Sequence, residues 1–290
     1  MVKRSSRLKK IIWIAVGLVL VVALFCAWLY TGKLTQSKQA ILQTFSLPIA
    51  LVNGQAITMK NFVFKYSLAK KLFGQQELAK QDSEIKQKIF NQLIDEKELE
   101  LFAVQKNLSI NQRDLDNEYA AQAKAVNLEG KKSLSELLSS YGLNEVALKN
   151  QILKPQLLFI KLRVWYNSQE SLNTQAYGRA GELVAEIKKG TDMGQLAANF
   201  SQDETGKSTK GDLGFVDIAD LTPELKEPVA GLLIGEPEII PSRQGLHIIR
   251  LEAKNGNKVQ LRQIFLNTGD FESWWNSQKQ TFKIYKLINF

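Results

Sequence analysis

Two stretches near the C-terminus decide the fold: Gly245–Arg250 (GLHIIR) and Leu261–Leu266 (LRQIFL). Both combine β-branched or aromatic residues with polar ones over the length of an ordinary strand. Asn255-Gly256 between them is a strong turn signal. We therefore expect a β-hairpin that contributes two neighbouring strands to one sheet.

The side-chain pattern of this hairpin fixes its register. The apolar residues of the two arms share a face only if the connection has an odd number of residues or contains a bulge around Asn255–Asn257. A plain two-residue turn would place His247 and Gln263 on opposite faces. With a three-residue loop, Gln263 lies opposite Ile249 and diagonal to His247. We expect this second arrangement, with the imidazole and the carboxamide on one wall.

Two further motifs precede the hairpin. Phe200–Asp203 (FSQD) is a polar loop after a short helical pattern, and Gly211–Phe215 (GDLGF) is a glycine turn leading into a strand. Taken singly, each motif has an ordinary explanation. Asp203 suits a turn, the glycines suit a turn, and His247 on a half-apolar strand suits a structural role. Their common order along the chain favours a shared site.

In order and spacing, Phe200–Asp203, Gly211–Phe215 and Gly245–Arg250 resemble the acidic loop, the glycine turn and the histidine strand of parvulin-type peptidyl-prolyl isomerases. Leu261–Leu266 resembles the parvulin opening strand, but it follows the other motifs and carries Gln263 where that strand has histidine. The resemblance implies a small antiparallel sheet with helices, circularly permuted so that its first strand comes last.

The resemblance also assigns roles to side chains. The implied catalytic set is Asp203, facing the substrate carbonyl, together with His247 and Gln263. The implied substrate-binding set, which grips the proline ring or stands beside the histidine, comprises Leu213, Phe215, Leu221, Leu225 and Ser242. Taken alone, the leucines are equally typical of plain core.

The chemistry that the resemblance implies is rotation about an X-Pro bond. The barrier of about 18–20 kcal/mol comes from amide resonance, and no covalent bond is broken. A catalyst therefore has only to favour the twisted amide over both planar forms. No cofactor or metal is expected. Because glutamine cannot titrate, the alternative is a parvulin fold that has lost catalysis through Gln263.

The N-terminus carries a separate signal. The first ten residues hold five basic side chains and no acidic one, and Ile11–Gly32 contains no charged residue. A helix of this length spans about 33 Å, enough to cross a bilayer core. We expect residues 11–32 to be a transmembrane helix, with the basic tail cytoplasmic and the bulk of the chain extracytoplasmic, on a periplasmic or cell-wall side. A cleaved signal peptide is the alternative, but the run is long and no A-x-A-like site follows it.

Composition excludes several classes of function. The formal charge of +9 falls to +4 outside the basic tail, where 33 basic residues stand against 29 acidic ones. A weak field over a long chain argues against nucleic acid as a partner. Cys26 is the only cysteine and His247 the only histidine. Neither a disulfide within the chain nor a metal site rich in cysteine or histidine is expected.

Residues 47–170 read as a hairpin followed by helices. Ala50–Ile57 contains Asn53-Gly54 between two apolar arms, and Thr58 is a plausible N-cap for the next helix. Helical periodicity continues to Trp165, with an interruption expected at Pro155. The segment resembles the N-terminal domain of the SurA/PrsA/PpiD group of exported chaperones. Periodicity alone is equally typical of an unrelated helical bundle.

These observations predict an α+β chain with five parts. They are a basic tail and transmembrane helix (1–33), a linker (34–46), a SurA-N-like helical chaperone domain (47–170), a parvulin-like domain (171–267) and an aromatic-rich C-terminal tail (268–290). The tail is expected to be a helix packed on the parvulin-like domain, or else to line a cradle for unfolded segments.

The predicted function is that of a membrane-anchored foldase. Its partners would be unfolded or nascent exported polypeptides with X-Pro bonds. The alternatives are a non-catalytic holdase or interaction module, and an envelope scaffold without client specificity.

Overall fold

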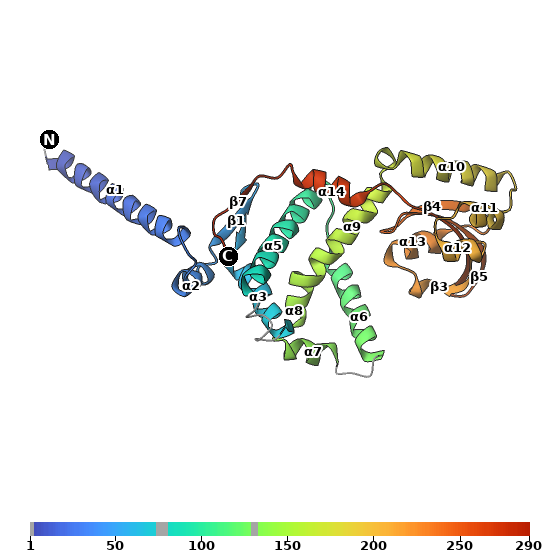
Figure 1. The fold of residues 1–290 in the computed structure, drawn as a ribbon, viewed down its shortest axis with the longest axis horizontal. Coiled ribbons are helices and arrows are strands. Elements are labelled where there is room, and N and C mark those ends of the chain that lie inside the picture. The colour runs from blue at the N-terminus through green and yellow to red at the C-terminus, as the bar shows by residue number, and fades with distance from the viewer. Residues whose placement is uncertain (1–2, 74–80, 129–132) are drawn as a thin grey trace. The chain divides into compact units, whose positions relative to one another are not determined.

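The computed structural model describes the backbone of residues 3–73, 81–128 and 133–290 (Figure 1). The side chains of residues 3–15, 73, 127 and 128 lie outside this description. The chain forms two compact units. The first comprises Met1–Leu101, Lys131–Asn144 and Lys279–Phe290, and the second comprises Phe102–Gly130 and Glu145–Gln278. Both units are therefore assembled from segments that are distant in sequence.

The first unit begins with α1 (Lys3–Tyr30) and α2 (Gln36–Thr44), and Thr35 caps α2 by accepting a hydrogen bond from the Lys38 amide. The side chains of the predicted basic tail lie outside the described residues. Across the part of the chain that was described, no helix combines the length and apolar character that a membrane crossing needs.

The predicted hairpin follows, formed by β1 (Pro48–Val52) and β2 (Gln55–Thr58). Asn53 and Gly54 both have positive φ, 46° and 81°, as the two-residue turn of a twisted hairpin requires. Helix α3 (Met59–Phe73) comes next, and the Thr58 hydroxyl accepts from the Asn61 amide at 3.4 Å. The predicted N-cap is therefore present. The same unit also contains the long helix α5 (Asp82–Gln105), of which residues 82–101 belong here, and the short helix α7 (Leu134–Ser140).

The C-terminus completes the first unit. Strand β7 (Ile284–Lys286) pairs antiparallel with β1, giving a sheet of order β2-β1-β7. The Phe290 ring stacks on Phe62, with centroids 3.8 Å apart, and meets Phe90 edge-on at 5.2 Å. The expected tail 268–290 is therefore divided, because its last residues bury apolar surface in the first unit.

The rest of that tail, α14 (Phe271–Lys279), lies largely in the second unit beside α9 (Lys154–Ser168). The Trp274 ring lies 4.8 Å from Tyr166 and 5.9 Å from Trp165. The Trp274 ring thus packs against residues of a helix that precedes the predicted parvulin-like domain. Before α9 the helix widens into a π-helical turn at Lys149–Leu153. This irregularity directly precedes Pro155, which lacks an amide donor, as predicted.

The helices of the second unit not yet named are short or of moderate length. They are α6 (Gln112–Leu128), α8 (Glu145–Leu148), η2 (Glu170–Leu172), α10 (Thr174–Lys188), α11 (Met193–Phe200), α12 (Glu204–Ser208), η3 (Ile218–Asp220) and α13 (Pro223–Gly231).

The second sheet has the order β3-β6-β5-β4 and is antiparallel throughout. Its strands are β3 (Asp212–Asp217), β4 (Pro237–Pro241), β5 (Leu246–Asn255) and β6 (Lys258–Leu266). Strand β6, the last of the four in the chain, occupies an inner position between β3 and β5. The sheet is therefore closed from the C-terminal side, as predicted.

The β5–β6 hairpin has the predicted register. Gln263 pairs with Ile249, and His247 pairs with Phe265. The connection is a two-residue turn, and the required shift of one residue comes from a bulge at Glu252, between Leu251 and Ala253. A bulge changes the pairing parity as an odd loop does. His247 and Gln263 therefore share one face of the sheet.

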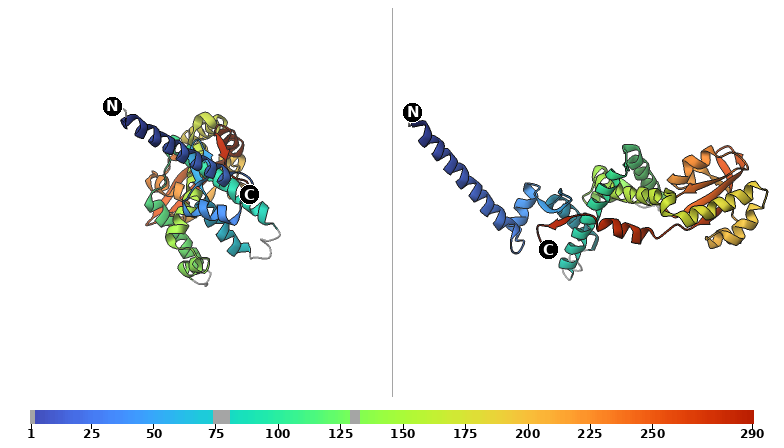
Figure 2. Two further views of the ribbon diagram at one scale, coloured as in Figure 1. Left: turned by 90° about the vertical axis from the view of Figure 1, so that its left-hand side faces the viewer. Right: turned by 90° about the horizontal axis from the view of Figure 1, so that it is seen from above.

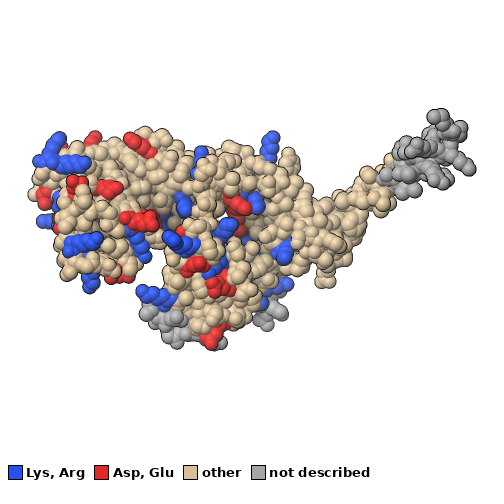
Figure 3. Space-filling model, turned by 180° about the vertical axis from the view of Figure 1, so that it is seen from behind, with Lys and Arg blue, Asp and Glu red and all other residues tan. Residues whose placement is uncertain are grey.

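Helices lie over both faces of this sheet (Figure 2), and an apolar core lies beneath them on each face. On one face Leu246, Ile248 and Ile264 pack against α10 and α11. On the other, Ile249, Leu251 and residues of β6 pack against α13. On the side of the molecule seen in Figure 3, acidic and basic side chains are interspersed rather than gathered by sign.

Candidate functional site

His247 is buried on β5, with 4% of its surface exposed, and both ring nitrogens are engaged. Its Nδ1 lies 2.8 Å from Gln263 Oε1, and its Nε2 lies 2.7 Å from Ser242 Oγ. A carboxamide oxygen can only accept, so Nδ1 carries the proton. The Ser242 hydroxyl, which accepts from the Gln244 amide at 3.0 Å, donates to Nε2. The imidazole is thus satisfied in its neutral form.

The surroundings of His247 favour this neutral form. Burial lowers the pKa of His247 below its usual value, because the charged ring would lose its hydration. The hydrogen bond to Gln263 and the carboxylates of Glu224 and Asp203 oppose this shift without reversing it. The ring therefore holds a fixed pattern of one donor and one acceptor at neutral pH.

Gln263 is held in place through its backbone. The Gln263 amide donates to the Gly211 carbonyl at 2.8 Å, where the glycine turn meets β6. Gly211 has φ of +75°, and a Cβ atom there would stand 2.3 Å from the Gln263 carbonyl oxygen. Only glycine fits this approach. The predicted glycine motif therefore positions the carboxamide that orients His247.

The predicted acidic loop docks on the same strand. The Gln202 amide donates to the Phe265 carbonyl at 2.7 Å, and the Phe265 amide donates to Ser201 Oγ at 3.2 Å. The Asp203 carboxylate accepts from the amides of Thr205 and Gly206, at 3.3 and 2.9 Å, and so caps α12. Asp203 therefore has a structural task as well as a place close enough to influence His247.

Ser242 is fixed by polar contacts that sequence reasoning missed. Its carbonyl accepts from buried Asn167 Nδ2 at 2.7 Å. The neighbouring Arg243 forms a bidentate ion pair with Glu224 of α13, in which Nε lies 2.7 Å from Oε1 and Nη2 lies 3.0 Å from Oε2. Burial raises the pKa of Glu224, but the Arg243 guanidinium lowers it by more, so that the net pKa lies below its usual value. This pair ties α13 to the Ser242 loop.

Of the predicted apolar set, Leu225 is buried in the apolar cluster between α13 and the sheet, and Leu221 is half-buried against that cluster. That cluster includes Ile249, the pairing partner of Gln263, so it adjoins the polar pair. Leu213 on β3 is 39% exposed, as a side chain at the rim of a binding surface can be.

Phe215 is not brought together with the other predicted residues. It is 54% exposed and pairs with Gln260, whose side chain lies on the face opposite Gln263. The cause is the register shift between Asp212 and Phe215, at Gly214 with φ of +64°. This extra residue places Phe215 on the face of the sheet opposite Gln263.

The junction between α9 and the sheet rests on two buried asparagines. Asn167 Oδ1 accepts from the Thr268 hydroxyl at 2.7 Å, and Asn173 Oδ1 accepts from the Gly269 amide at 2.9 Å. Asn173 Nδ2 also donates to the Tyr166 carbonyl at 2.7 Å. The segments that lead into and out of the sheet are thus bonded together. A single sequence carries no signal for such pairing, because asparagine is equally common in exposed turns.

Two cavities of about 450 and 470 Å³ are also present, one in each unit. Neither is lined by His247, Gln263 or Asp203. The cavity in the second unit lies between the start of α10 and the end of β6. The hydrogen-bonded pair of His247 and Gln263 therefore lies outside both of these cavities.

Comparison with known families gives two matches. Residues 143–255 match the PPIC-type PPIASE domain, and residues 1–163 match the SurA-like N-terminal domain. The first match ends at the β5–β6 turn and leaves β6 outside, consistent with the permuted order seen in the sheet. The second spans more than half of the chain.

Individual relatives agree with these matches. Foldase protein PrsA of Caldanaerobacter subterraneus is 25% identical over 257 residues, covering 80% of this chain and 82% of that protein. Chaperone SurA of Pseudomonas aeruginosa is 28% identical over 117 residues, covering 38% of this chain and 28% of that protein. The crystal structure of PrsA from Bacillus subtilis covers 81% of this chain and 84% of its own at 16% identity, with a TM-score of 0.23.

Proposed function

We propose that this chain is a membrane-anchored extracytoplasmic foldase. It belongs to the SurA-like N-terminal domain family, and it carries a PPIC-type (parvulin-type) PPIase domain. In this proposal it binds unfolded exported polypeptides and isomerises their X-Pro bonds. The observation that supports catalysis most is the hydrogen-bonded pair of His247 and Gln263 beside the apolar cluster of α13.

Gln263 is compatible with catalysis in this proposal. The family position is occupied by a histidine, which can accept a hydrogen bond through a neutral ring nitrogen. The Gln263 oxygen offers His247 Nδ1 an acceptor at 2.8 Å and so serves the same need. Because amide rotation requires no proton transfer to solvent, a non-titrating partner loses little. The role of this pair is to hold a rigid polar floor, with Asp203 beside it and Leu213, Leu221 and Leu225 forming the apolar rim.

The anchor in α1 is supported by two observations. Ile11–Gly32 carries no charge. Apolar side chains over the described part of α1 are exposed on all sides, with Leu24 at 70%, Val21 at 66% and Phe25 at 46%. A helix that is apolar all round requires a non-aqueous environment. The basic tail would then remain cytoplasmic. Protease added outside spheroplasts should digest the residues after 33, whereas full protection would refute this orientation.

An isomerisation assay tests the catalytic proposal. The full chain in detergent should accelerate cis–trans exchange of a short X-Pro peptide, and His247→Ala should lower the rate by about tenfold or more. Asp203→Asn keeps an N-capping side chain and removes the charge. It should also lower the rate, whereas Asp192→Asn, which alters the cap of α11, should not. Rates unchanged in both His247→Ala and Asp203→Asn would refute the catalytic assignment.

A non-catalytic holdase is the second candidate. The observation that favours it is the burial of His247, whose ring is 4% exposed and has no free nitrogen for a substrate. The holdase predicts that the chain suppresses aggregation of an unfolded client without accelerating X-Pro exchange. A chain that does neither would be a scaffold.

A further inference from the structure

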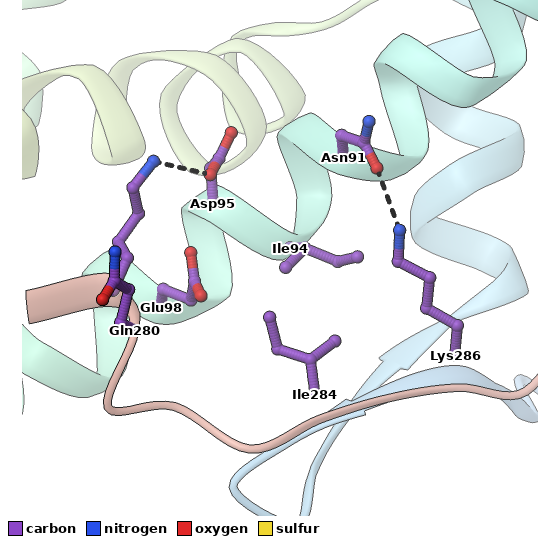
Figure 4. Close-up of a pocket in the computed structure, with 8 residues that line it drawn as sticks. Asn91, Ile94, Asp95, Glu98, Gln280, Ile284 and Lys286 are labelled. Atoms are coloured by element: carbon purple, nitrogen blue, oxygen red, sulfur yellow. Dashed lines mark hydrogen bonds and ion pairs between the residues drawn. The ribbon is translucent and has the colours of Figure 1, made fainter. Parts of the chain in front are cut away.

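A second buried titratable group lies in the first unit, facing a cavity of about 450 Å³ (Figure 4). Glu98 of α5 is 3% exposed, and its side chain is directed into the space between α5 and the C-terminal segment. Ile94 and Ile284 form apolar walls beside it. The cavity is therefore an open hollow in which the Glu98 carboxyl group lies beside two isoleucines, and the rest of its lining is polar or charged.

The other charged groups that line this cavity are engaged. Lys279 pairs with Asp95 at 3.2 Å. Lys286 lies 3.4 Å from Asn91 Oδ1, and its ammonium group stands 5.6 Å from the centre of the Phe90 ring. Within the described residues, Glu98 has no hydrogen-bond or ion-pair partner. It is the one acid of the cavity left uncompensated.

An isolated buried carboxylate is costly, and the protein shows this cost. Burial and, to a smaller extent, the nearby Asp95 raise the pKa of Glu98, Lys279 opposes them, and the net value is about 7. A cation that enters the cavity would favour the ionised form and form a charge-assisted hydrogen bond. The Glu98 carboxyl group is therefore chemically suited to a positively charged occupant.

The wall opposite α5 indicates what kind of molecule carries that charge. Ile284 and Lys286 belong to β7, the edge strand of the sheet β2-β1-β7. Its outer edge pairs with no strand in the described part of the chain. Free backbone donors and acceptors on an edge bind an extended polypeptide. A metal ion is a poorer fit, because the described residues contain no cluster of three potential ligands.

We propose that this cavity binds a lysine or arginine side chain of an extended client polypeptide, with Glu98 as its counter-ion and Ile94 and Ile284 flanking its aliphatic stem. The proposal rests on the proposed function in one respect, namely that unfolded polypeptides are the clients. It adds a sequence preference that is independent of proline, so the two can fail separately.

Two proline-free peptides test the proposal, identical except for one central lysine or norleucine. The full chain should bind the lysine peptide about tenfold more tightly in a fluorescence anisotropy titration at pH 8. Glu98→Gln, which preserves shape, should abolish this preference and leave the norleucine peptide unaffected. Glu100→Gln, on an exposed part of the same helix, should behave as the wild type.

The preference should also depend on pH. Between pH 6 and pH 8 the affinity for the lysine peptide should rise in the wild type as Glu98 ionises, and it should stay flat in Glu98→Gln. Equal binding of the two peptides by the wild type, absence of binding, or a preference that survives in Glu98→Gln would each overturn the proposal. Because neither peptide contains proline, such a result leaves the isomerase assay unaffected.

Discussion

His247 in the second unit and Glu98 in the first are both buried titratable residues, yet their surroundings are opposite. His247 has a partner at each ring nitrogen, 2.7 and 2.8 Å away. Glu98 has none among the described residues and faces a cavity. Both lie beside strands that the end of the chain supplies, β6 and β7 respectively. His247 is therefore held in one orientation by its hydrogen bonds, whereas the Glu98 carboxyl group is available to bind the ligand proposed above.

The pKa values of His247 and Glu98 shift in opposite directions for one common reason, because one group is a base and the other an acid. Burial favours the neutral form of both groups, lowering the pKa of His247 and raising that of Glu98 to about 7. For His247 the neutral form already fulfils every hydrogen bond, so nothing is gained by charging it. For Glu98 an incoming cation would reverse the balance.

The largest expected effect tests how tightly the His247 centre is built. Gly211→Ala places a Cβ atom against the Gln263 carbonyl and forces a strained φ, so it should lower the free energy of unfolding by about 3–5 kcal/mol. Gly214→Ala is the matched control, since it too has positive φ but no atom within 4 Å of the added carbon. It should cost about 1 kcal/mol. Equal costs in urea titrations would contradict the close approach.

The next effect concerns the polar partner of His247. Gln263→Leu removes the acceptor of the Nδ1 proton and leaves a buried donor unpaired, so it should destabilise the protein by about 1–3 kcal/mol. Gln260→Leu changes the same residue type on the opposite face of β6. It should alter stability by no more than about 0.5 kcal/mol. Similar losses in both variants would show that the carboxamide does not support the imidazole.

At Glu98 we expect a substitution to stabilise the protein rather than to destabilise it. The pKa of about 7 in the folded chain exceeds the ordinary 4.5, so ionisation destabilises the fold progressively as pH rises through this interval. Glu98→Gln removes that penalty and should raise Tm by about 2–5 °C at pH 8, with little change at pH 4.5. Glu100→Gln, measured alongside by thermal denaturation, should show no such dependence. A lower Tm for Glu98→Gln at pH 8 would mean that the carboxylate has a partner.

Sequence patterns predicted the parts of this molecule that depend on local order. The period of the hairpin gave the pairing of Gln263 with Ile249, and Pro155 gave the helix irregularity. The face on which Phe215 lies was not predictable, because a register shift at Gly214 leaves no trace in the sequence pattern.

Contacts between distant segments could not be predicted from the sequence. The Glu224–Arg243 ion pair and the Asn167 bonds depend on how loops meet in space. Glu98 looks like any other acid on a charged helix, and its burial follows from the return of the C-terminal segment.

The most direct measurement uses the fact that His247 is the only histidine in the chain. Long-range proton–nitrogen spectra of a tag-free chain labelled with ¹⁵N-histidine report a single imidazole. We expect the neutral ring with its proton on Nδ1 at pH 7, titrating with a midpoint below 6.5. A proton on Nε2, or a midpoint at or above 6.5, would contradict the neutral ring that donates from Nδ1 to Gln263 and accepts at Nε2 from Ser242.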